Sequence, residues 1–125
     1  MPVLPLVAAA LVVAAWLVLR LVTRPDVGGA EARELVAGGA RLVDVRTPRE
    51  YAAGHLPGAI NVPVDKLETY LSKLPKRKEV IAYCRGPYCL MSFEAVAKLR
   101  KRGFKAKRLA DGYPEWRAAG LPVER

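Results

Sequence analysis

The stretch of this sequence with the clearest capacity for chemistry is a short loop that contains both cysteines of the chain. The loop reads C-R-G-P-Y-C, from Cys84 to Cys89, and follows a short apolar run at residues 80–83. A helical pattern begins directly after it. A cysteine placed between a buried strand and a helix lies where α/β folds bind their ligands. This position suits a nucleophilic Cys84.

The electrostatics of such a loop favour a thiolate. The backbone N–H groups of the loop and the amino end of the next helix direct partial positive charge at the sulfur. That field lowers the pKa of a thiol from about 8.5 towards neutrality. Gly86 gives the loop freedom to turn, and Arg85 adds a cation. The alternative is an inert, buried cysteine at the end of a strand.

A second thiol in the same loop has chemistry of its own. Cys89 could resolve a persulfide or sulfenate on Cys84 into a disulfide, passing sulfur on or guarding the nucleophile. We therefore hypothesise that the two cysteines form a reversible disulfide. The alternative is that Cys89 is a small side chain with no chemical role at the start of the helix.

The elements that position this loop follow from hydrophobic periodicity. Short apolar runs predict four strands, at residues 41–45, 59–62, 80–83 and 105–109. Helical spacing predicts helices at residues 29–38, 48–53, 64–74, 91–102 and 113–119. Thr47, Pro48 and Glu50 supply the cap, the first-turn proline and the capping-box acid of one of them. Strands alternating with helices indicate a mostly parallel α/β sheet covered on both faces.

The first residues of the chain have a different composition. Residues 3–22 are almost wholly apolar, with Arg20 as the only charge, and about 20 helical residues span the ~30 Å hydrocarbon layer. We expect a transmembrane helix at residues 1–22, a short linker at residues 23–27 and one folded domain at residues 28–125. A buried core helix and a cleaved signal peptide are the alternatives, but no basic residue precedes the apolar run and it exceeds the usual length of a signal h-region.

The charge distribution suggests an orientation and a set of partners. Basic residues follow the apolar run, at positions 20, 24, 33 and 41, which predicts a single-pass protein of the cell (inner) membrane with its catalytic domain on the cytoplasmic side. The net charge of +9 fits a solvated surface or attraction to anionic lipid, worth about 1 kcal/mol per well-placed cation. Nucleic acid is disfavoured as a partner, because a five-residue linker of about 17 Å holds the domain beside the bilayer.

Several motifs around the loop resemble those of one family. Asp44-Val45-Arg46 with Glu50, the stretch G-H-L-P-G-A-I-N at residues 54–61, and D-G-Y-P-E-W at residues 111–116 are similar to the signature motifs of rhodanese-like domains. The loop itself resembles their Y-C-R-x-G active-site motif. The match covers about two-thirds of the chain in the right order. It implies an α/β, three-layer, rhodanese-like domain with a mostly parallel central sheet, preceded here by the apolar helix. Abundant Ala, Val, Leu and Arg are typical of a bacterial chain from a GC-rich genome.

What the resemblance implies is sulfur transfer. The thiolate of Cys84 would take sulfane sulfur from a small-molecule donor, thiosulfate or a persulfide, and hold it as a persulfide. A thiol, which can belong to a protein, or cyanide would then accept it. The backbone of Arg85, Gly86, Pro87, Tyr88 and Cys89 would cradle the persulfide. The resemblance implies neither a cofactor nor a metal.

Two features of the loop depart from the family pattern. Pro87 lacks an N–H group to offer the persulfide, and Cys89 stands where many relatives carry a basic or hydroxyl side chain. A weaker positive field makes dianionic thiosulfate a poorer donor than a persulfide.

The other motif residues are expected to support the site. Asp44, Arg46 and Glu50 are predicted to form a buried charge network that fixes the loops, His55 to stabilise a turn, and Trp116 to lie in the core. One alternative function is a relay or redox-sensing module that uses the cysteine pair without turnover. A phosphatase or arsenate reductase is disfavoured, because no basic residue lies between Cys89 and Lys98 to clamp an oxyanion.

Overall fold

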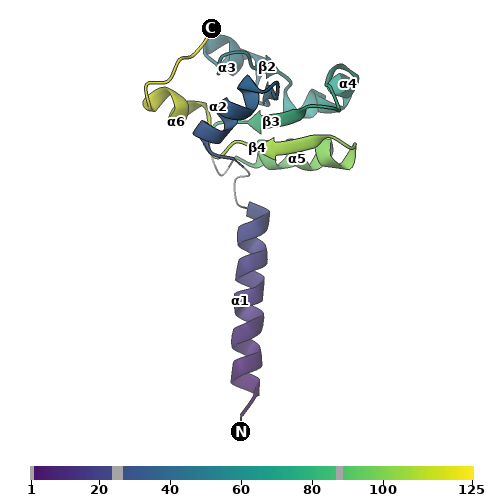
Figure 1. Ribbon diagram of the computed structural model, residues 1–125, viewed down its shortest axis with the longest axis vertical. Helices are drawn as coiled ribbons and strands as arrows, with labels where there is room; N and C mark the ends of the chain where they lie inside the picture. The colour runs from purple at the N-terminus through teal and green to yellow at the C-terminus, as the bar shows by residue number, and fades with distance from the viewer. Residues whose placement is uncertain (1, 24–26, 87–88) are drawn as a thin grey trace.

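The fold is a parallel α/β domain with one additional helix at the amino end. The computed structural model describes residues 2–23, 27–86 and 89–125. Figure 1 shows helix α1 (Leu4–Thr23) extending away from the domain, in which the remaining helices surround a central sheet. The expected α/β fold with a parallel central sheet is confirmed.

The sheet places the end of one interior strand where the sequence predicted it. Its strands are β1 (Arg41–Asp44), β2 (Ile60–Asn61), β3 (Glu79–Tyr83) and β4 (Lys105–Arg108). They pair in parallel in the order β2-β1-β3-β4. Because the strands are parallel, their carboxyl ends meet at one edge of the sheet. The strand that leads into Cys84, β3, lies between two neighbours at that edge.

Helices cover both faces of this sheet. They are α2 (Gly29–Ala37), α3 (Pro48–Ala53), α4 (Leu67–Tyr70), α5 (Leu90–Lys101) and α6 (Tyr113–Ala118). The side chains of β3 alternate between two hydrophobic clusters, as the pleat of a strand requires. Val80 and Ala82 join the cluster under α4 and α5, whereas Ile81 and Tyr83 join the cluster under α2 and α6. The domain therefore has three layers.

The helix predicted at residues 64–74 is broken into three pieces. A 3-10 turn (Val64–Lys66), α4 and a second 3-10 turn (Leu71–Lys73) follow one another. Leu67 and Leu74 are both buried, so the apolar contacts survive the break. Leu74 is extended, with φ −93° and ψ 135°, because Pro75 disfavours a helical conformation in the residue before it.

The predicted linker ends inside the fold. Val27 is 2% exposed and forms a parallel bridge with Leu109. Its N–H donates to the carbonyl of Arg108 at 3.1 Å, and its carbonyl accepts from the N–H of Ala110 at 2.7 Å. Val27, at the end of the predicted linker, therefore packs as part of the folded domain. The other linker residues, 24–26, lie outside the described residues.

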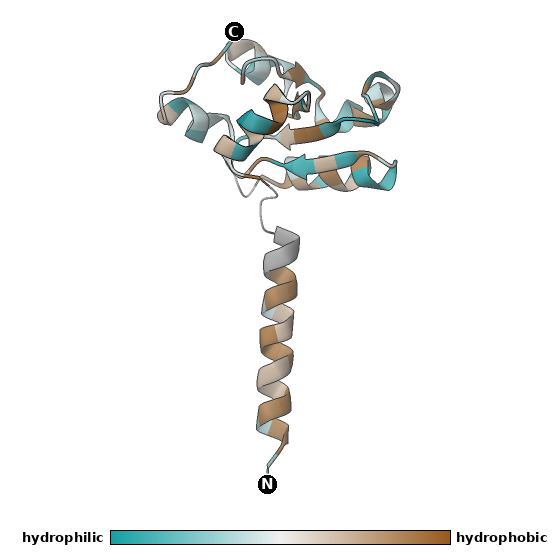
Figure 2. Ribbon diagram, in the orientation of Figure 1, coloured by the Kyte–Doolittle hydropathy of each residue, from teal (hydrophilic) through white to brown (hydrophobic). Residues whose placement is uncertain are grey.

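The structure corrects the prediction of a membrane anchor. Helix α1 is apolar and exposed along residues 4–19 (Figure 2). Among the described residues, no helix combines the length and apolarity needed to cross a bilayer. The predicted transmembrane helix, the single-pass membrane location with its cytoplasmic domain, and the membrane partner are therefore wrong.

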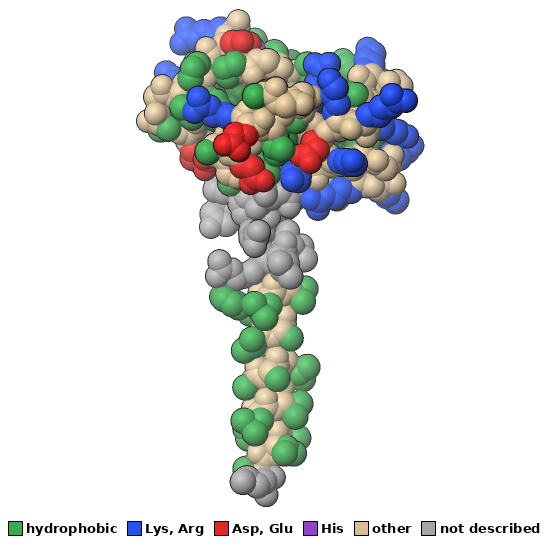
Figure 3. All heavy atoms as spheres, viewed as in Figure 1, with side chains coloured by type: hydrophobic (Ala, Val, Ile, Leu, Met, Phe, Trp, Pro, Cys, Tyr) green, Lys and Arg blue, Asp and Glu red, His purple; other side chains and the backbone are tan. Residues whose placement is uncertain are grey.

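The positive charge of the chain lies largely on the surface of the domain. Figure 3 shows Lys and Arg side chains gathered on the side that carries α4 and α5. Several of them pair with carboxylates at the surface, as in Lys98–Glu94, Arg102–Glu68 and Lys107–Glu79. These pairs fit the expected solvated surface.

A buried polar network joins the carboxyl ends of β1 and β3. Arg46 donates to the carboxylate of Asp44 through Nε and Nη2, the latter at 2.7 Å, and Nη2 also donates to the carbonyl of Gly54 at 2.7 Å. The hydroxyl of Tyr83 donates to Oδ2 of Asp44 at 2.8 Å and accepts from the N–H of Leu56 at 3.1 Å. Burial, with the Asp44 carboxylate, raises the pKa of Tyr83, so the hydroxyl remains a donor.

This network predicts a specific loss of stability. We expect Tyr83→Phe to lower the free energy of unfolding by about 1–3 kcal/mol, because it removes one hydrogen bond to the buried Asp44 carboxylate and leaves the N–H of Leu56 without its partner. This free energy is measured by urea unfolding, with circular dichroism as the signal. Tyr70→Phe, in the cluster on the opposite face of the sheet, is the matched control. Equal stability of Tyr83→Phe and the unchanged protein would contradict the assigned role.

Candidate active-site loop

Cys84 occupies the first position after β3, at the carboxyl edge of the sheet. It is 1% exposed and belongs to the core cluster under α5. Its carbonyl accepts a hydrogen bond of 3.0 Å from the N–H of Tyr113, the first residue of α6. The position of the predicted nucleophile is therefore fixed by a sheet strand on one side and by a helix start on the other.

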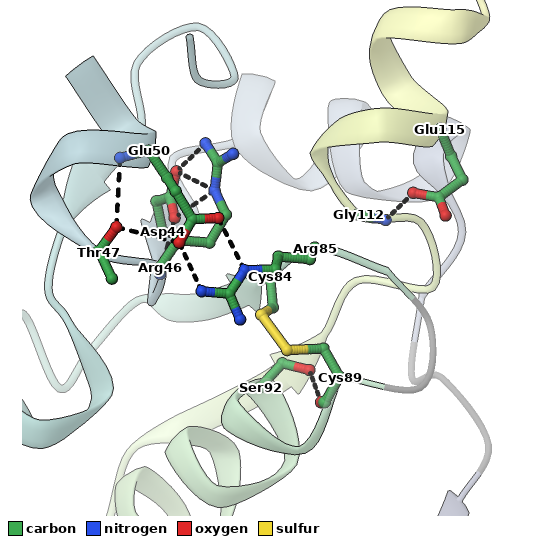
Figure 4. Close-up of a disulfide and its surroundings, with 10 residues drawn as sticks. All are labelled: Asp44, Arg46, Thr47, Glu50, Cys84, Arg85, Cys89, Ser92, Gly112 and Glu115. Atoms are coloured by element: carbon green, nitrogen blue, oxygen red, sulfur yellow. Dashed lines mark hydrogen bonds and ion pairs between the residues drawn. A yellow bond between two sulfur atoms is a disulfide. The ribbon is translucent and has the colours of Figure 1, made fainter. Parts of the chain in front are cut away.

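The two cysteines of the loop are bonded to each other (Figure 4). Their Cα atoms are 6.2 Å apart, within the usual range for a disulfide. Cys89 is the N-cap residue of α5. Its N–H donates to the carbonyl of Gly86 at 3.2 Å, and its carbonyl accepts from Oγ of Ser92 at 2.9 Å. The disulfide thus spans a loop whose two ends are held by a strand and by a helix.

The predicted persulfide cradle is described only in part. The Cys89 N–H closes a turn onto Gly86 in the disulfide form, so it is engaged within the loop. Pro87 and Tyr88 lie outside the described residues. The first turn of α5 follows directly, and a helix amino end directs partial positive charge towards a neighbouring anion.

The cation of the loop, Arg85, forms an ion pair with a carboxylate of helix α3. Arg85 donates to Glu50 through Nε at 2.8 Å and through Nη2 at 2.5 Å, a two-point ion pair at the surface (Figure 4). Glu50 lies in the first turn of α3, where its N–H donates to Oγ1 of the cap residue Thr47. The hydrogen bonds from Arg85 lower the pKa of Glu50 to about 2. Glu50 therefore bridges α3 to the loop instead of joining the buried Asp44–Arg46 pair, and Arg85 is partly neutralised.

Helix α6 begins in contact with the loop. A Cβ atom at Gly112 would overlap the backbone of Cys84, Arg85 and Gly86, so only glycine fits this approach. Glu115 accepts from the N–H of Gly112 at 3.0 Å and lies close to Gly86. Sequence reasoning missed this contact. The available signal was a glycine at the start of a predicted helix, since glycine marks places where backbones approach closely.

The remaining predicted site residues lie behind or beside the loop. His55 stacks on Tyr51 with ring centroids 3.7 Å apart, and its Nδ1 is 2.8 Å from the carbonyl of Tyr51. Its backbone pairs with Glu124 through two hydrogen bonds of 2.8 Å. These contacts fasten the C-terminal segment to the turn after α3. Trp116 is 6% exposed, in the core. Within the described parts of the chain, His, Cys, Asp and Glu form no cluster able to hold a metal ion.

Comparison with known proteins identifies the family. The model of the rhodanese-like domain matches residues 29–119. The thiosulfate:glutathione sulfurtransferase of Homo sapiens is 36% identical over 106 residues, covering 74% of this chain and 92% of that protein. A sulfurtransferase of Allochromatium vinosum is 36% identical over 83 residues, covering 66% of this chain and 76% of that protein. The chain belongs to the rhodanese-like domain family.

Other relatives differ from this chain in length and in name. The HTH-type transcriptional regulator Rv0324 of Mycobacterium tuberculosis is 51% identical over 92 residues. The match covers 74% of this chain but only 41% of the regulator. Among solved structures, the BH2092 protein of Bacillus halodurans superposes with a TM-score of 0.73 at 31% identity, covering 89% of this chain and 84% of that one. Family membership therefore defines the fold and a class of relatives, while the activity of this chain must be argued from its own loop.

The Arg85–Glu50 pair predicts an unusual titration. Because the folded-state pKa of Glu50 is about 2 and the ordinary value is 4.5, the stabilisation by this pair is fully present above pH 4.5 and is lost as the pH falls towards 2. Carbon-detected NMR should find the Glu50 carboxyl ionised at a pH midway between these values. Arg85→Met should move its titration midpoint back towards 4.5. An ordinary midpoint in the unchanged, folded protein would contradict the pair.

Proposed function

We propose that this chain is a sulfurtransferase that carries sulfane sulfur as a persulfide on Cys84. The observation that supports it most is the position of Cys84, between the end of an interior strand and the amino end of α5. This surrounding stabilises an anionic sulfur, and it does so equally for a thiolate and for a persulfide anion. Relatives named as sulfurtransferases support the same chemistry.

The proposed reaction begins with the reduced loop. The thiolate of Cys84 attacks the outer sulfur of the donor, forming a new S–S bond and expelling sulfite from thiosulfate or a thiolate from a persulfide. An acceptor thiolate or cyanide then attacks the outer sulfur of the persulfide, and Cys84 leaves as a thiolate again. Because Cys84 is bonded to Cys89 in this structure, a thiol must first reduce the loop before the cycle can start.

The charges around the loop favour a persulfide donor over thiosulfate. The guanidinium of Arg85 is engaged by Glu50, and Glu115 places a second carboxylate near Gly86. Two carboxylates offset the positive field of the helix end, so the dianionic thiosulfate is attracted less than a donor of lower charge. The acceptor is a small-molecule thiol or a thiol of a protein.

The bonded cysteine pair favours a second candidate function. In that alternative the domain is a relay or redox-sensing module that loads one sulfur atom, or forms the Cys84–Cys89 disulfide, without repeated turnover. The two functions differ in stoichiometry: an enzyme transfers many sulfur atoms per chain, whereas a module without turnover transfers at most one. A turnover measurement therefore separates them.

The central test removes the sulfur carrier. We expect Cys84→Ser to reduce sulfur transfer from glutathione persulfide to cyanide, measured as thiocyanate, to the background rate, because a serine hydroxyl is not ionised at neutral pH and forms no persulfide. Cys89→Ser, which removes the same disulfide, should retain measurable transfer. Undiminished transfer by Cys84→Ser would contradict the proposal, and a single equivalent of product per unchanged chain would favour the relay.

The donor preference has a test of its own. We expect Glu50→Gln to raise kcat/KM for thiosulfate by about three- to tenfold, because it exposes the charge of Arg85 to a dianion. The gain for glutathione persulfide should be smaller, and high salt should diminish the gain for thiosulfate. Glu68→Gln is the matched control, since it breaks the surface pair with Arg102 elsewhere in the domain. The same gain in both variants, or no gain in Glu50→Gln, would argue against a role for this pair in donor choice.

A further inference from the structure

Cys89 is the one reactive side chain of the loop that sulfur transfer through Cys84 does not require. Its sulfur is nevertheless bonded to Cys84 while β3 and α5 are both formed. The thiol of Cys89 therefore lies within reach of Cys84 without unfolding either element. A thiol at that distance competes with any external acceptor for the sulfur on Cys84.

We propose that Cys89 resolves the Cys84 persulfide, so that the domain reduces sulfane sulfur to hydrosulfide. This inference rests on the proposed function, because it begins from a persulfide on Cys84. It adds an activity that needs no external sulfur acceptor. The disulfide seen in the structure is the product state of this step.

The step balances in atoms and electrons. The Cys89 thiolate attacks Sγ of Cys84 in the persulfide, a bond forms between the two cysteine sulfurs, and the bond from Sγ to the outer sulfur breaks. The outer sulfur leaves with the electron pair as HS⁻, taking up the persulfide proton where that group is protonated or one from water where it is not. The two cysteine sulfurs are oxidised to a disulfide by two electrons, and the outer sulfur is reduced by the same two.

The geometry favours attack on the inner sulfur. Sγ of Cys84 is held in place by the strand end and by the bond from Tyr113 N–H to the Cys84 carbonyl. Cys89 is held by Gly86 and Ser92 at the start of α5. The bond between the two Sγ atoms is the one that this arrangement accommodates. Attack on the outer sulfur would instead need room for an additional atom between them.

The same arrangement indicates how the loop is reset. Cys84 is 1% exposed, whereas Cys89 is partly exposed. An external dithiol therefore meets the sulfur of Cys89 first, and Cys84 becomes the leaving group. A thiolate stabilised by its surroundings leaves faster, and Cys84 lies at the end of β3 beside the amino end of α5. Reduction from outside thus returns the nucleophile directly to its thiolate form, with the dithiol oxidised to a disulfide.

The test is a single loading experiment on the full chain. Reduced protein, freed of excess reductant, is mixed with one equivalent of glutathione persulfide and no further thiol. Released sulfide is measured with a fluorescent probe, and the protein is analysed by intact mass and by peptide mapping under acid quench. We expect close to one equivalent of sulfide per chain and a protein that has lost two hydrogen atoms, with Cys84 linked to Cys89.

The variants separate this inference from the proposed function. Cys89→Ser should gain one sulfur atom on Cys84 and release almost no sulfide beyond the rate of the donor alone. Cys84→Ser should gain no sulfur and release none. A subsequent dithiol such as dithiothreitol should restore the unchanged protein for a second loading.

Three outcomes would overturn the inference. A stable persulfide on Cys84 of the unchanged protein, without sulfide, would leave the proposed function intact and refute resolution by Cys89. Sulfane sulfur found on Cys89 would show relay through the outer sulfur instead. Equal sulfide release by Cys89→Ser would assign the reduction to another group, whereas failure of Cys89→Ser to take up any sulfur would count against the proposed function itself.

Discussion

Tyr83 and Asp44 are paired in register at the carboxyl ends of β3 and β1, and the Tyr83 hydroxyl donates to the Asp44 carboxylate at 2.8 Å. This bond lies one residue before Cys84. A buried carboxylate is stable only when its oxygens are satisfied, so Arg46 and Tyr83 cannot be moved independently. The network therefore fixes the position of the last residue of β3, and with it the position of Cys84, the next residue in the chain.

Two helices then contact the loop that follows. Helix α6 approaches so closely at Gly112 that no side chain fits there, while α3 supplies Glu50 to Arg85. The first contact fixes the backbone of the loop and the second sets its charge. Arg85 is the cation adjacent to Cys84 in the chain, and Glu50 partly neutralises it. A site governed by dipoles stabilises a singly charged sulfur without strongly attracting a dianion.

Much of this was predictable because the responsible signals are local. Apolar runs and caps located the four strands and most helices, and the Thr47 cap with Glu50 at the third position marked the start of α3. The contacts that define the site are not local. Arg85 meets Glu50 across 35 residues, and Gly112 meets the loop only after β4 and α6 have packed. The membrane prediction was wrong, because no helix among the described residues is both long and apolar enough to cross a bilayer.

The placement of the two cysteines gives them unequal roles. Cys84 terminates a buried strand and is almost wholly covered, while Cys89 caps a helix and is partly exposed. In thiol–disulfide exchange the accessible sulfur is attacked and the better-stabilised sulfur departs. If Cys84 carries sulfur as proposed, the fold favours reduction of the disulfide by attack at Cys89, with Cys84 as the leaving group. Under the proposed function, loading of sulfur at Cys84 and reduction of the disulfide at Cys89 would then begin at different sulfurs of one loop.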